Sequence, residues 1–202
     1  MGPPRPVHPI VRPPYNRIPP YWWRWAGWGA ATGWLVGASL AAPYYYGYGE
    51  NVYYYDENVY IDGQIAATAA EYYDGAKALA TSAPPVEKTS KEEWLPLGVF
   101  GLYQGQSQDS NTVLQLAVNK QGVLSGTYYN LATNTERPVS GMVDQKTQRA
   151  AWTFADGKNT DVIMETGLAN LTEDRAPALV HFGADKTEQW LMVRQPGPKS
   201  GT

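Results

Sequence analysis

The sequence predicts a mainly β protein whose central unit is an eight-stranded antiparallel meander barrel. From Trp94 onward, apolar and polar residues alternate with a period of two, which is the spacing of strands with one buried face. Turn residues such as Gln121-Gly122 and Asp156-Gly157 recur about every ten residues, and short connections favour antiparallel neighbours. Eight strands in a meander can close into a ring, which removes the exposed edges of an open sheet.

The predicted strands are short and fill most of the C-terminal half. They span residues 98–104, 112–119, 123–131, 137–144, 149–155, 161–167, 176–182 and 188–194. Burying each large apolar side chain stabilises the fold by roughly 1.5–3 kcal/mol, so this core can hold without metal or disulfide and leaves at most a narrow cavity. Alternation assigns to the interior Leu114, Leu116, Val118, Leu124, Gly126, Tyr128, Trp152, Phe154, Ala178, Val180, Phe182, Trp190 and Met192.

The N-terminal 24 residues predict a disordered arm rich in proline and arginine. Residues 1–20 hold eight of the chain's 16 prolines, and proline fixes φ and removes a backbone donor. Such a segment either spaces two parts of a protein or serves as a ligand for an aromatic groove, and the spacer is the simpler interpretation.

Residues 25–49 form an apolar segment rich in Trp, Gly and Tyr. No charged residue lies between Trp25 and Ala42, a length near the lower limit for a membrane-spanning helix, and aromatic residues flank both ends. In a helix, Gly29, Gly33 and Gly37 would form a stripe that a second backbone could approach, with Tyr45 in the flanking aromatic belt. The segment is therefore a candidate membrane anchor. The alternative is an aromatic, glycine-rich linker of an exported protein.

Residues 50–83 predict a β-hairpin followed by a helix. The segment "NVYYYDENVYIDGQ" places two runs of strand formers on either side of the turn residues 56–58. Thr68 and Glu71 match a capping box, and the apolar spacing after them predicts a helix over 69–80. An isolated hairpin is marginal in water, so it must dock on the barrel, on a second copy of the chain or on a membrane; carbohydrate stacking on its tyrosines is a further option.

The rest of the chain divides into three parts. Residues 84–93 are a polar linker, residues 94–196 are the barrel domain and residues 197–202 are a tail.

The charge distribution argues against a nucleic-acid partner. The net charge is −3, and the only basic region is the N-terminal arm, which would favour an anionic surface such as lipid headgroups. No basic stripe for nucleic acid is visible. The chain contains no cysteine, which excludes disulfides and cysteine-type zinc sites.

Two titratable residues of the barrel are candidates for chemistry. Glu165 interrupts the apolar run "VIMETG". If its side chain faced the barrel interior, it would need a partner such as Arg149 or Arg175 and could anchor a ligand. Simple alternation instead favours a solvent-facing side chain. His181 lies on the opposite face of its strand from the apolar residues beside it, and the sequence pairs it with no nucleophile or acid, so a structural histidine is favoured. A hydrolase using Glu165 or His181 is the remaining enzymatic alternative.

No other pattern indicates catalysis. The oxygen-rich turn "DGKNTD" at 156–161 lacks the distal glutamate of a calcium-binding hand. The chain has no phosphate-binding glycine loop, no metal-ligand spacing and no nucleophile elbow. The sequence therefore predicts a protein that is not an enzyme and that uses no cofactor or metal.

Several stretches resemble a family of planctomycete envelope proteins that carry the labels mu-protocadherin or putative cell-surface protein. They are "EWLPLGVFGLYQG", "LQLAVNKQGVLSGTYYN", "SGMVDQKTQRAAWTF" and "METGLANLTEDRAPALVHFGADKTEQWLMVRQP", together with the hairpin and helix before the barrel. The resemblance covers residues 44–196. It implies export behind a signal sequence to the periplasm or cell surface, with no established activity. The paired acidic calcium motifs of cadherin repeats are absent.

A second resemblance is to avidin-type barrels, with a topology that lipocalins share. The stretch "GVLSGTYYN" is similar to their second hairpin, and Trp152 and Trp190 stand where such barrels place ring-stacking tryptophans. A likeness of this kind supports topology more than ligand.

These observations predict a non-enzymatic envelope protein with a β-barrel interaction domain. Residues 25–61 would mediate attachment to a membrane or cell-wall surface, or self-association. The alternative is a small-ligand binder that uses the barrel mouth, with Tyr128, Trp152 and Trp190 lining the site and Glu165 as a further candidate contact.

Overall fold

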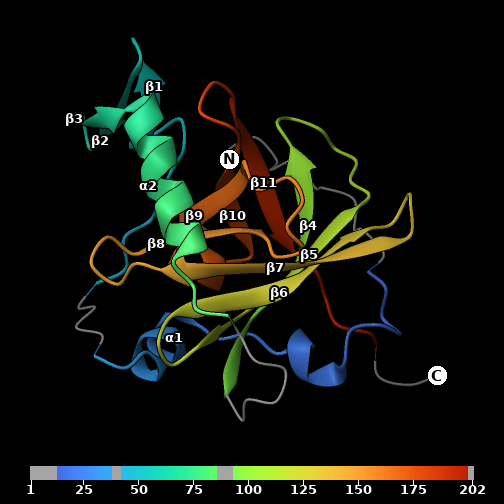
Figure 1. Ribbon diagram of the computed structural model, residues 1–202. Coiled ribbons are helices and arrows are strands. Elements are labelled where there is room, and N and C mark those ends of the chain that lie inside the picture. The colour runs from blue at the N-terminus through green and yellow to red at the C-terminus, as the bar shows by residue number, and fades with distance from the viewer. Residues whose placement is uncertain (1–12, 38–41, 86–92, 200–202) are drawn as a thin grey trace, which may run out of the picture.

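The structure, a computed structural model, describes residues 13–37, 42–85 and 93–199 (Figure 1). Strands outnumber helices among the described elements, and the predicted linker falls largely in 86–92, outside the described residues. The helical elements are η1 (Pro20–Trp23), α1 (Trp28–Trp34), α2 (Ala69–Thr81) and η2 (Asn170–Thr172). The strands are β1 (Val52–Tyr55), β2 (Asn58–Ile61), β3 (Gln64–Thr68), β4 (Trp94–Gln104), β5 (Thr112–Asn119), β6 (Val123–Asn130), β7 (Thr135–Val143), β8 (Arg149–Phe154), β9 (Val162–Gly167), β10 (Arg175–Phe182) and β11 (Thr187–Arg194).

Strands β4 to β11 form a closed antiparallel barrel, which confirms the predicted fold class. Each strand pairs with the next along the chain, and β11 pairs with β4 to close the ring. The predicted strand ends agree with the structure to within two residues, except that β4 begins four residues early, at Trp94. That extension includes an irregularity between Pro96 and Gly98, where proline offers no ladder N–H.

The barrel interior is packed with apolar side chains, as the alternation predicts. Trp152 is completely buried there, among leucines from β5 and β6 and valines from β7 and β10. Phe182 is the exception among the expected inward residues, since it lies near the end of the barrel wall and is 39% exposed. The strands approach very closely at Gly126, where an added Cβ would lie 1.8 Å from the carbonyl oxygen of Gln115.

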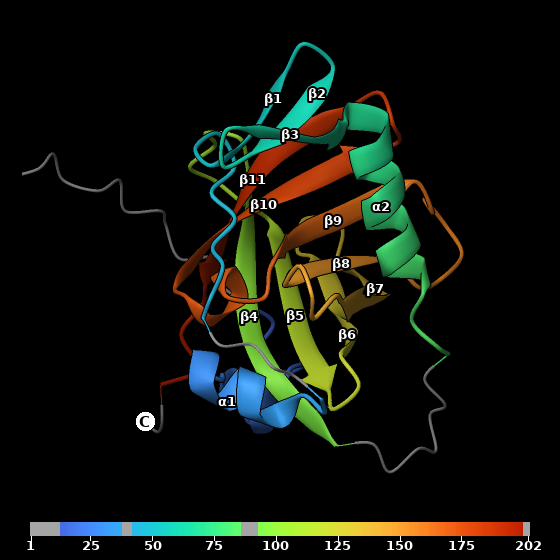
Figure 2. The ribbon, with the colours of Figure 1, turned by 90° about the vertical axis from the view of Figure 1, so that its left-hand side faces the viewer.

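Helix α1 closes one end of the barrel (Figures 1 and 2). Leu35, just after the helix, is buried against the core, and the indole of Trp34 donates a hydrogen bond to the carbonyl of Val118 at 3.2 Å. Residues 25–37 do not form the long helix that a membrane anchor over this segment would need, because α1 has only seven residues and Gly37 beyond it has a φ of 75°. Gly29 and Gly33 lie on α1 but Gly37 lies beyond its end, so the three glycines do not form a stripe on one helix. Within the described part of the chain, no helix combines the length and apolar character that a membrane crossing requires.

Residues 13–24 differ from the disordered arm that their composition predicts. Ile18 is 2% exposed and packs with Tyr103, Val113 and Tyr129 on the outer wall of the barrel. Trp23 covers the same region, and its indole donates to the carbonyl of Ile18 at 3.3 Å. The proline-rich composition predicts disorder, but Ile18 and the neighbouring tryptophans bury enough apolar surface to hold this segment on the barrel. Residues 1–12 lie outside the described part.

The segment 42–85 forms a second layer on the outside of the barrel, here called the cover. The predicted hairpin is present as β1 and β2, and a third strand, β3, which the sequence did not reveal, extends it into a small sheet. Helix α2 starts at the predicted capping box, in which Thr68 and Glu71 satisfy each other's backbone N–H groups. Figure 2 shows the small sheet above β10 and β11, with α2 running alongside β9, β8 and β7.

Candidate functional site

The cover is held on the barrel by aromatic and small side chains. Tyr72 packs with Leu179 on the outer wall, and Ala76 and Ala80 of α2 pack against Ala151 and Ile163. Alanines on the inner face of α2 let the helix lie close to the strands. The outer faces of β8, β9 and β10 are therefore buried as well as their inner faces.

A buried ionic cluster lies between the cover and the barrel wall. Glu165 on β9 is completely buried, and its Oε2 accepts hydrogen bonds from Nε and Nη2 of Arg149 at 3.0 and 2.7 Å. Its other oxygen, Oε1, lies 2.7 Å from Nε2 of the completely buried His181. The guanidinium of Arg149 also donates to the carbonyl of Tyr72 at 3.3 Å and lies 4.0 Å from the centre of that tyrosine ring. All three charged or titratable groups thus have partners with good geometry, as a buried cluster requires.

The cluster determines how the surrounding groups titrate. Burial lowers the pKa of the Arg149 guanidinium, but the charge and hydrogen bonds of Glu165, together with the effects of Tyr72 and Tyr48, more than offset this, so the pKa is raised overall. Burial raises the pKa of the Tyr48 and Tyr72 phenols well above the ordinary value, and the negative charge of Glu165 adds to the effect. Both phenols are therefore neutral at physiological pH. Their hydroxyls are buried and have no hydrogen-bond partner among the described residues.

One hydrogen bond connects this cluster to the surface. Nδ1 of His181 lies 2.8 Å from the hydroxyl of Thr187 on β11. The Thr187 hydroxyl also interacts with the phenol of Tyr54: hydrogen bonding lowers the pKa of that phenol, although the larger effect of burial raises it. A continuous chain therefore runs from Arg149 through Glu165, His181 and Thr187 to the tyrosine-rich strand β1.

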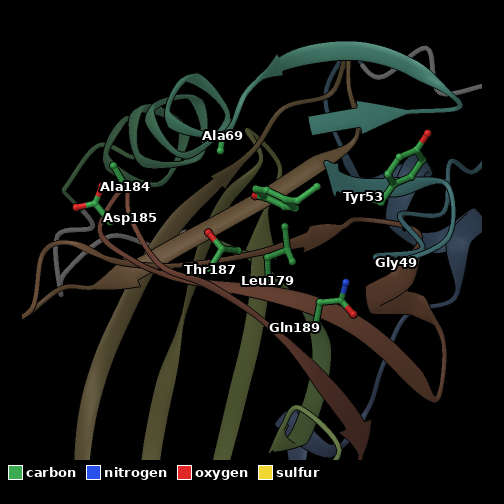
Figure 3. Close-up of a pocket in the computed structure, with 9 residues that line it drawn as sticks. Gly49, Tyr53, Ala69, Leu179, Ala184, Asp185, Thr187 and Gln189 are labelled. Atoms are coloured by element: carbon green, nitrogen blue, oxygen red, sulfur yellow. The ribbon is translucent and has the colours of Figure 1, made fainter. Parts of the chain in front are cut away.

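A cleft opens where this chain reaches the surface (Figure 3). It lies between the small sheet and the β10–β11 hairpin and has a cavity volume of about 420 Å³, within the roughly 300–1,000 Å³ typical of small-molecule sites. Figure 3 shows Tyr53 and Gly49 at one end, Ala184 and Asp185 at the other, and Gln189 along one side. The lining residues are Gly49, Tyr53, Tyr54, Ala69, Leu179, Ala184, Asp185, Thr187 and Gln189. We call this the Tyr54 cleft.

Three of the residues predicted as ligand contacts meet in one packed core, and the fourth, Glu165, lies apart from them. Trp152 is completely buried inside the barrel, while Tyr128 and Trp190 pack partly buried against the same core. The indole of Trp190 donates to Oε2 of Glu188 at 2.9 Å, and the ring of Tyr128 meets Phe154 edge-on. Glu165 lies on the opposite side of the wall from Trp152.

The structure therefore corrects the expected surroundings of Glu165. The prediction of a solvent-facing side chain is wrong, although Arg149 is one of the two partners considered. Glu165 points away from the barrel interior, as alternation requires, but the cover buries it. His181 is paired with Glu165, the acid that the sequence could not identify, and its structural role stays a prediction.

The residues predicted for membrane or self-association lie in separate places. Trp25 is 49% exposed, and the guanidinium of Arg194 lies 4.2 Å from its ring centre. Tyr45 is 44% exposed, and its hydroxyl donates to Glu173 at 3.1 Å. The next tyrosines along the chain, Tyr46 and Tyr48, belong to the cover and are buried in its contact with the barrel wall, so they do not form an exposed aromatic belt.

Sequence reasoning missed the lining of the Tyr54 cleft. Thr187 and Gln189 alternate with the inward residues of β11, so their outward direction was predictable, but nothing local shows that β1 lies opposite them. Among residues 13–37, 42–85 and 93–199, no group of three or more side chains could hold a metal ion. Comparison of the chain with protein-family models, curated proteins and solved structures found no match.

Proposed function

We propose that this protein is a non-enzymatic binding module of the cell envelope and that it holds its ligand in the Tyr54 cleft. The observation that supports this most strongly is the cleft itself, which combines apolar rings with a hydroxyl, an amide and a carboxylate on a rigid barrel wall. The envelope location rests on the sequence resemblance over residues 44–196 and not on the fold.

A binding role is favoured over catalysis because of how the polar chain is arranged. Glu165, His181 and Thr187 follow one another as carboxylate, imidazole and hydroxyl, which is the order of a nucleophilic triad. Glu165 and His181 are completely buried, however, and Arg149 binds the carboxylate through two hydrogen bonds. The Thr187 hydroxyl interacts with both His181 and Tyr54. The chain thus supports the cleft as a structural brace.

The cleft is also favoured over the barrel interior as the ligand site. The interior alternative relies on Trp152 as a lining residue, and this indole is completely buried in a dense apolar core. A ligand there would have to displace packed side chains, whereas Thr187 and Gln189 of the cleft are already accessible.

Co-sedimentation tests the proposal. The full chain is mixed with washed envelope fragments of the organism that produces it, alongside an Ala184→Trp variant that fills the cleft and a control, Ala132→Trp. Both substitutions place the same ring on an exposed residue outside the barrel strands. We expect the wild type and the control to sediment with the fragments and the cleft-filled variant to remain in solution. Equal sedimentation of all three proteins, or of none, would overturn the proposal.

A further inference from the structure

The Tyr54 cleft has the chemistry of a site for an uncharged sugar. We infer, on the basis of the proposed function, that its ligand is a neutral carbohydrate bound through ring stacking and hydroxyl contacts. The argument uses the charges of the lining, its aromatic rings, its polar groups and the rigidity behind them.

The lining has no positive charge to attract an anion. Asp185 is the only aspartate, glutamate, lysine or arginine among the described residues that line the cleft. Two cations beside lining residues or the cluster behind them are already paired: Lys186, next to Asp185 in the chain, lies 2.9 Å from Glu188, and Arg149 is bound to the buried Glu165. Phosphates and acidic polymers are therefore poor candidates, because they need arginine or lysine donors.

The lining also offers little to a cation. Asp185 is exposed in the β10–β11 turn, and Figure 3 places it at the opposite end of the cleft from Tyr53. A quaternary ammonium group binds most strongly where several ring faces surround it and exclude water. One exposed carboxylate far from the ring at the other end does not form such a cage.

The tyrosines supply the apolar part of a sugar site. The ring of Tyr53 stacks flat on Tyr60, with the centres 5.1 Å apart and the planes 1° from parallel. Tyr54 is 37% exposed and is supported edge-on by Tyr72 at 6.3 Å. A pyranose ring presents several C–H groups on one face, and a fixed aromatic ring can pack against that face with little loss of side-chain entropy.

The polar lining matches the hydroxyls of such a ring. The Gln189 amide is both donor and acceptor, Asp185 is an acceptor, and the Thr187 hydroxyl, which also contacts His181 and Tyr54, has a second lone pair as an acceptor. A sugar hydroxyl is likewise both donor and acceptor, so it can pair with any of these groups. Gly49 lies beside the Gln189 amide, where an added Cβ would come within 3.2 Å of Nε2. The absence of a side chain at Gly49 therefore leaves the amide accessible from that end.

The buried cluster keeps this lining in place. Thr187 is linked through His181 to Glu165, and Tyr72, which supports Tyr54, lies against the Arg149 guanidinium. A site that is ordered before the ligand arrives loses less entropy on binding. The cleft is thus suited to a ligand that offers only weak individual contacts.

Nuclear magnetic resonance of the full chain tests the ligand class. The probes are cellobiose, chitobiose and maltose as neutral sugars, inorganic phosphate as an anion and choline as a cation. We expect at least one disaccharide to shift the side-chain amide of Gln189 and the ring signals of Tyr53. Substitution by alanine at either residue should weaken binding about tenfold, the equivalent of one lost hydrogen bond or ring contact.

Matched controls separate the site from the rest of the surface. Tyr55→Ala removes a 69% exposed ring from the same strand outside the cleft, and Gln106→Ala removes an exposed amide from another turn. Both should leave the affinity unchanged within about twofold. If Tyr53→Ala does not fold, the exposed Gln189→Ala variant still decides the question.

The outcomes distinguish the ligand class from the proposed function. Shifts at Gln189 caused by choline or phosphate but by no sugar would overturn the carbohydrate assignment and leave the cleft as a binding site. If no probe shifts the cleft signals, while Ala184→Trp still abolishes sedimentation with envelope fragments, the carbohydrate class also fails and the binding function stands. If neither effect is found, both proposals are wrong.

Discussion

Replacing Glu165 with leucine should destabilise the protein far more than breaking an ion pair of equal length on its surface. The Glu165–Arg149 pair and the Asp161–Lys77 pair both have a shortest N–O distance of 2.7 Å. The side chain of Glu165 is 0% exposed and that of Arg149 is 15% exposed, whereas Asp161 and Lys77 are 70% and 40% exposed. Burial is therefore the main difference between them.

The expected magnitude follows from what the substitution leaves behind. Glu165→Leu removes the acceptor of two hydrogen bonds from Arg149 and the partner of His181. Among the described residues, the guanidinium then keeps the carbonyl of Tyr72, at 3.3 Å, as its hydrogen-bond acceptor, and the ring of the same tyrosine. Leaving a buried charge unpaired costs roughly 3–5 kcal/mol, whereas an exposed pair contributes about 0–1 kcal/mol. With a slope near 2 kcal/mol per molar urea, the unfolding midpoint should fall by about 2 M.

Urea unfolding followed by tryptophan fluorescence measures this difference. Asp161→Asn is the control, and its midpoint should move by less than about 0.5 M. The double variant Glu165→Leu/Arg149→Met should be more stable than the sum of the single substitutions by about 2 kcal/mol, because it no longer contains an unpaired buried charge. If Glu165→Leu costs no more than Asp161→Asn, the cluster does not hold the cover on the barrel and the reasoning fails.

Three further substitutions test other parts of the structure. Gly126→Ala should destabilise the barrel by about 3 kcal/mol or more, because its Cβ would overlap the adjacent strand. Gly29→Ala, on the exposed side of α1, should instead stabilise the protein by roughly 0.5–1 kcal/mol. The urea unfolding midpoints of the two variants measure this difference, and equal effects would contradict the packing argument. Hydrogen bonds from Arg137 lower the pKa of Asp156, so their stabilisation is present above the unfolded pKa of about 3.9 and is lost as pH falls through the folded pKa. Asp156→Asn should therefore lower the urea midpoint at pH 7, and lower it progressively less below pH 4. A loss of stability that grows as the solution becomes more acidic would refute this prediction. Tyr72→Phe removes a buried hydroxyl without a partner among the described residues. It should stabilise the protein by about 1 kcal/mol, which a slightly higher thermal unfolding midpoint would show. A loss of about 1 kcal/mol would instead show that the hydroxyl is hydrogen-bonded in solution.

The barrel could be predicted because its information is local. Strands such as 112–119 alternate strictly enough to define which face is buried, and the short turns between strands leave a meander as the simplest order. The capping box at Thr68 is equally local, since both partners lie within four residues. Closure of β11 on β4 is not local, but it follows once eight twisted strands have formed.

The cover could not be placed by the same reasoning, although the sequence carried a partial signal. Ala150-Ala151-Trp152 and the run from Ala178 to Val180 are continuously apolar, which is typical of strands buried on both faces. The ionic cluster required more than this pattern. Glu165 pairs with Leu179 across the β9–β10 ladder, so His181 is the diagonal neighbour on the same face. A shift of one residue in that register would have separated the two side chains, and single-sequence patterns do not determine register so finely.

The difference between the inner and outer faces of the barrel wall explains where the candidate function lies. The inner face of the wall obeys the alternation rule and is filled by packing, so its tryptophans were visible in the sequence but are not accessible. The outer face of β9 and β10 also obeys alternation, but Glu165 and His181 depart from the rule that buried residues are apolar, and their burial is tolerable because they pair with each other and with Arg149. Departures from local consistency are expected at functional sites, because stability alone would favour apolar residues there. The cleft opens where this polar chain reaches the surface at Thr187, so the features that made the face hard to predict are also those that give it a binding chemistry.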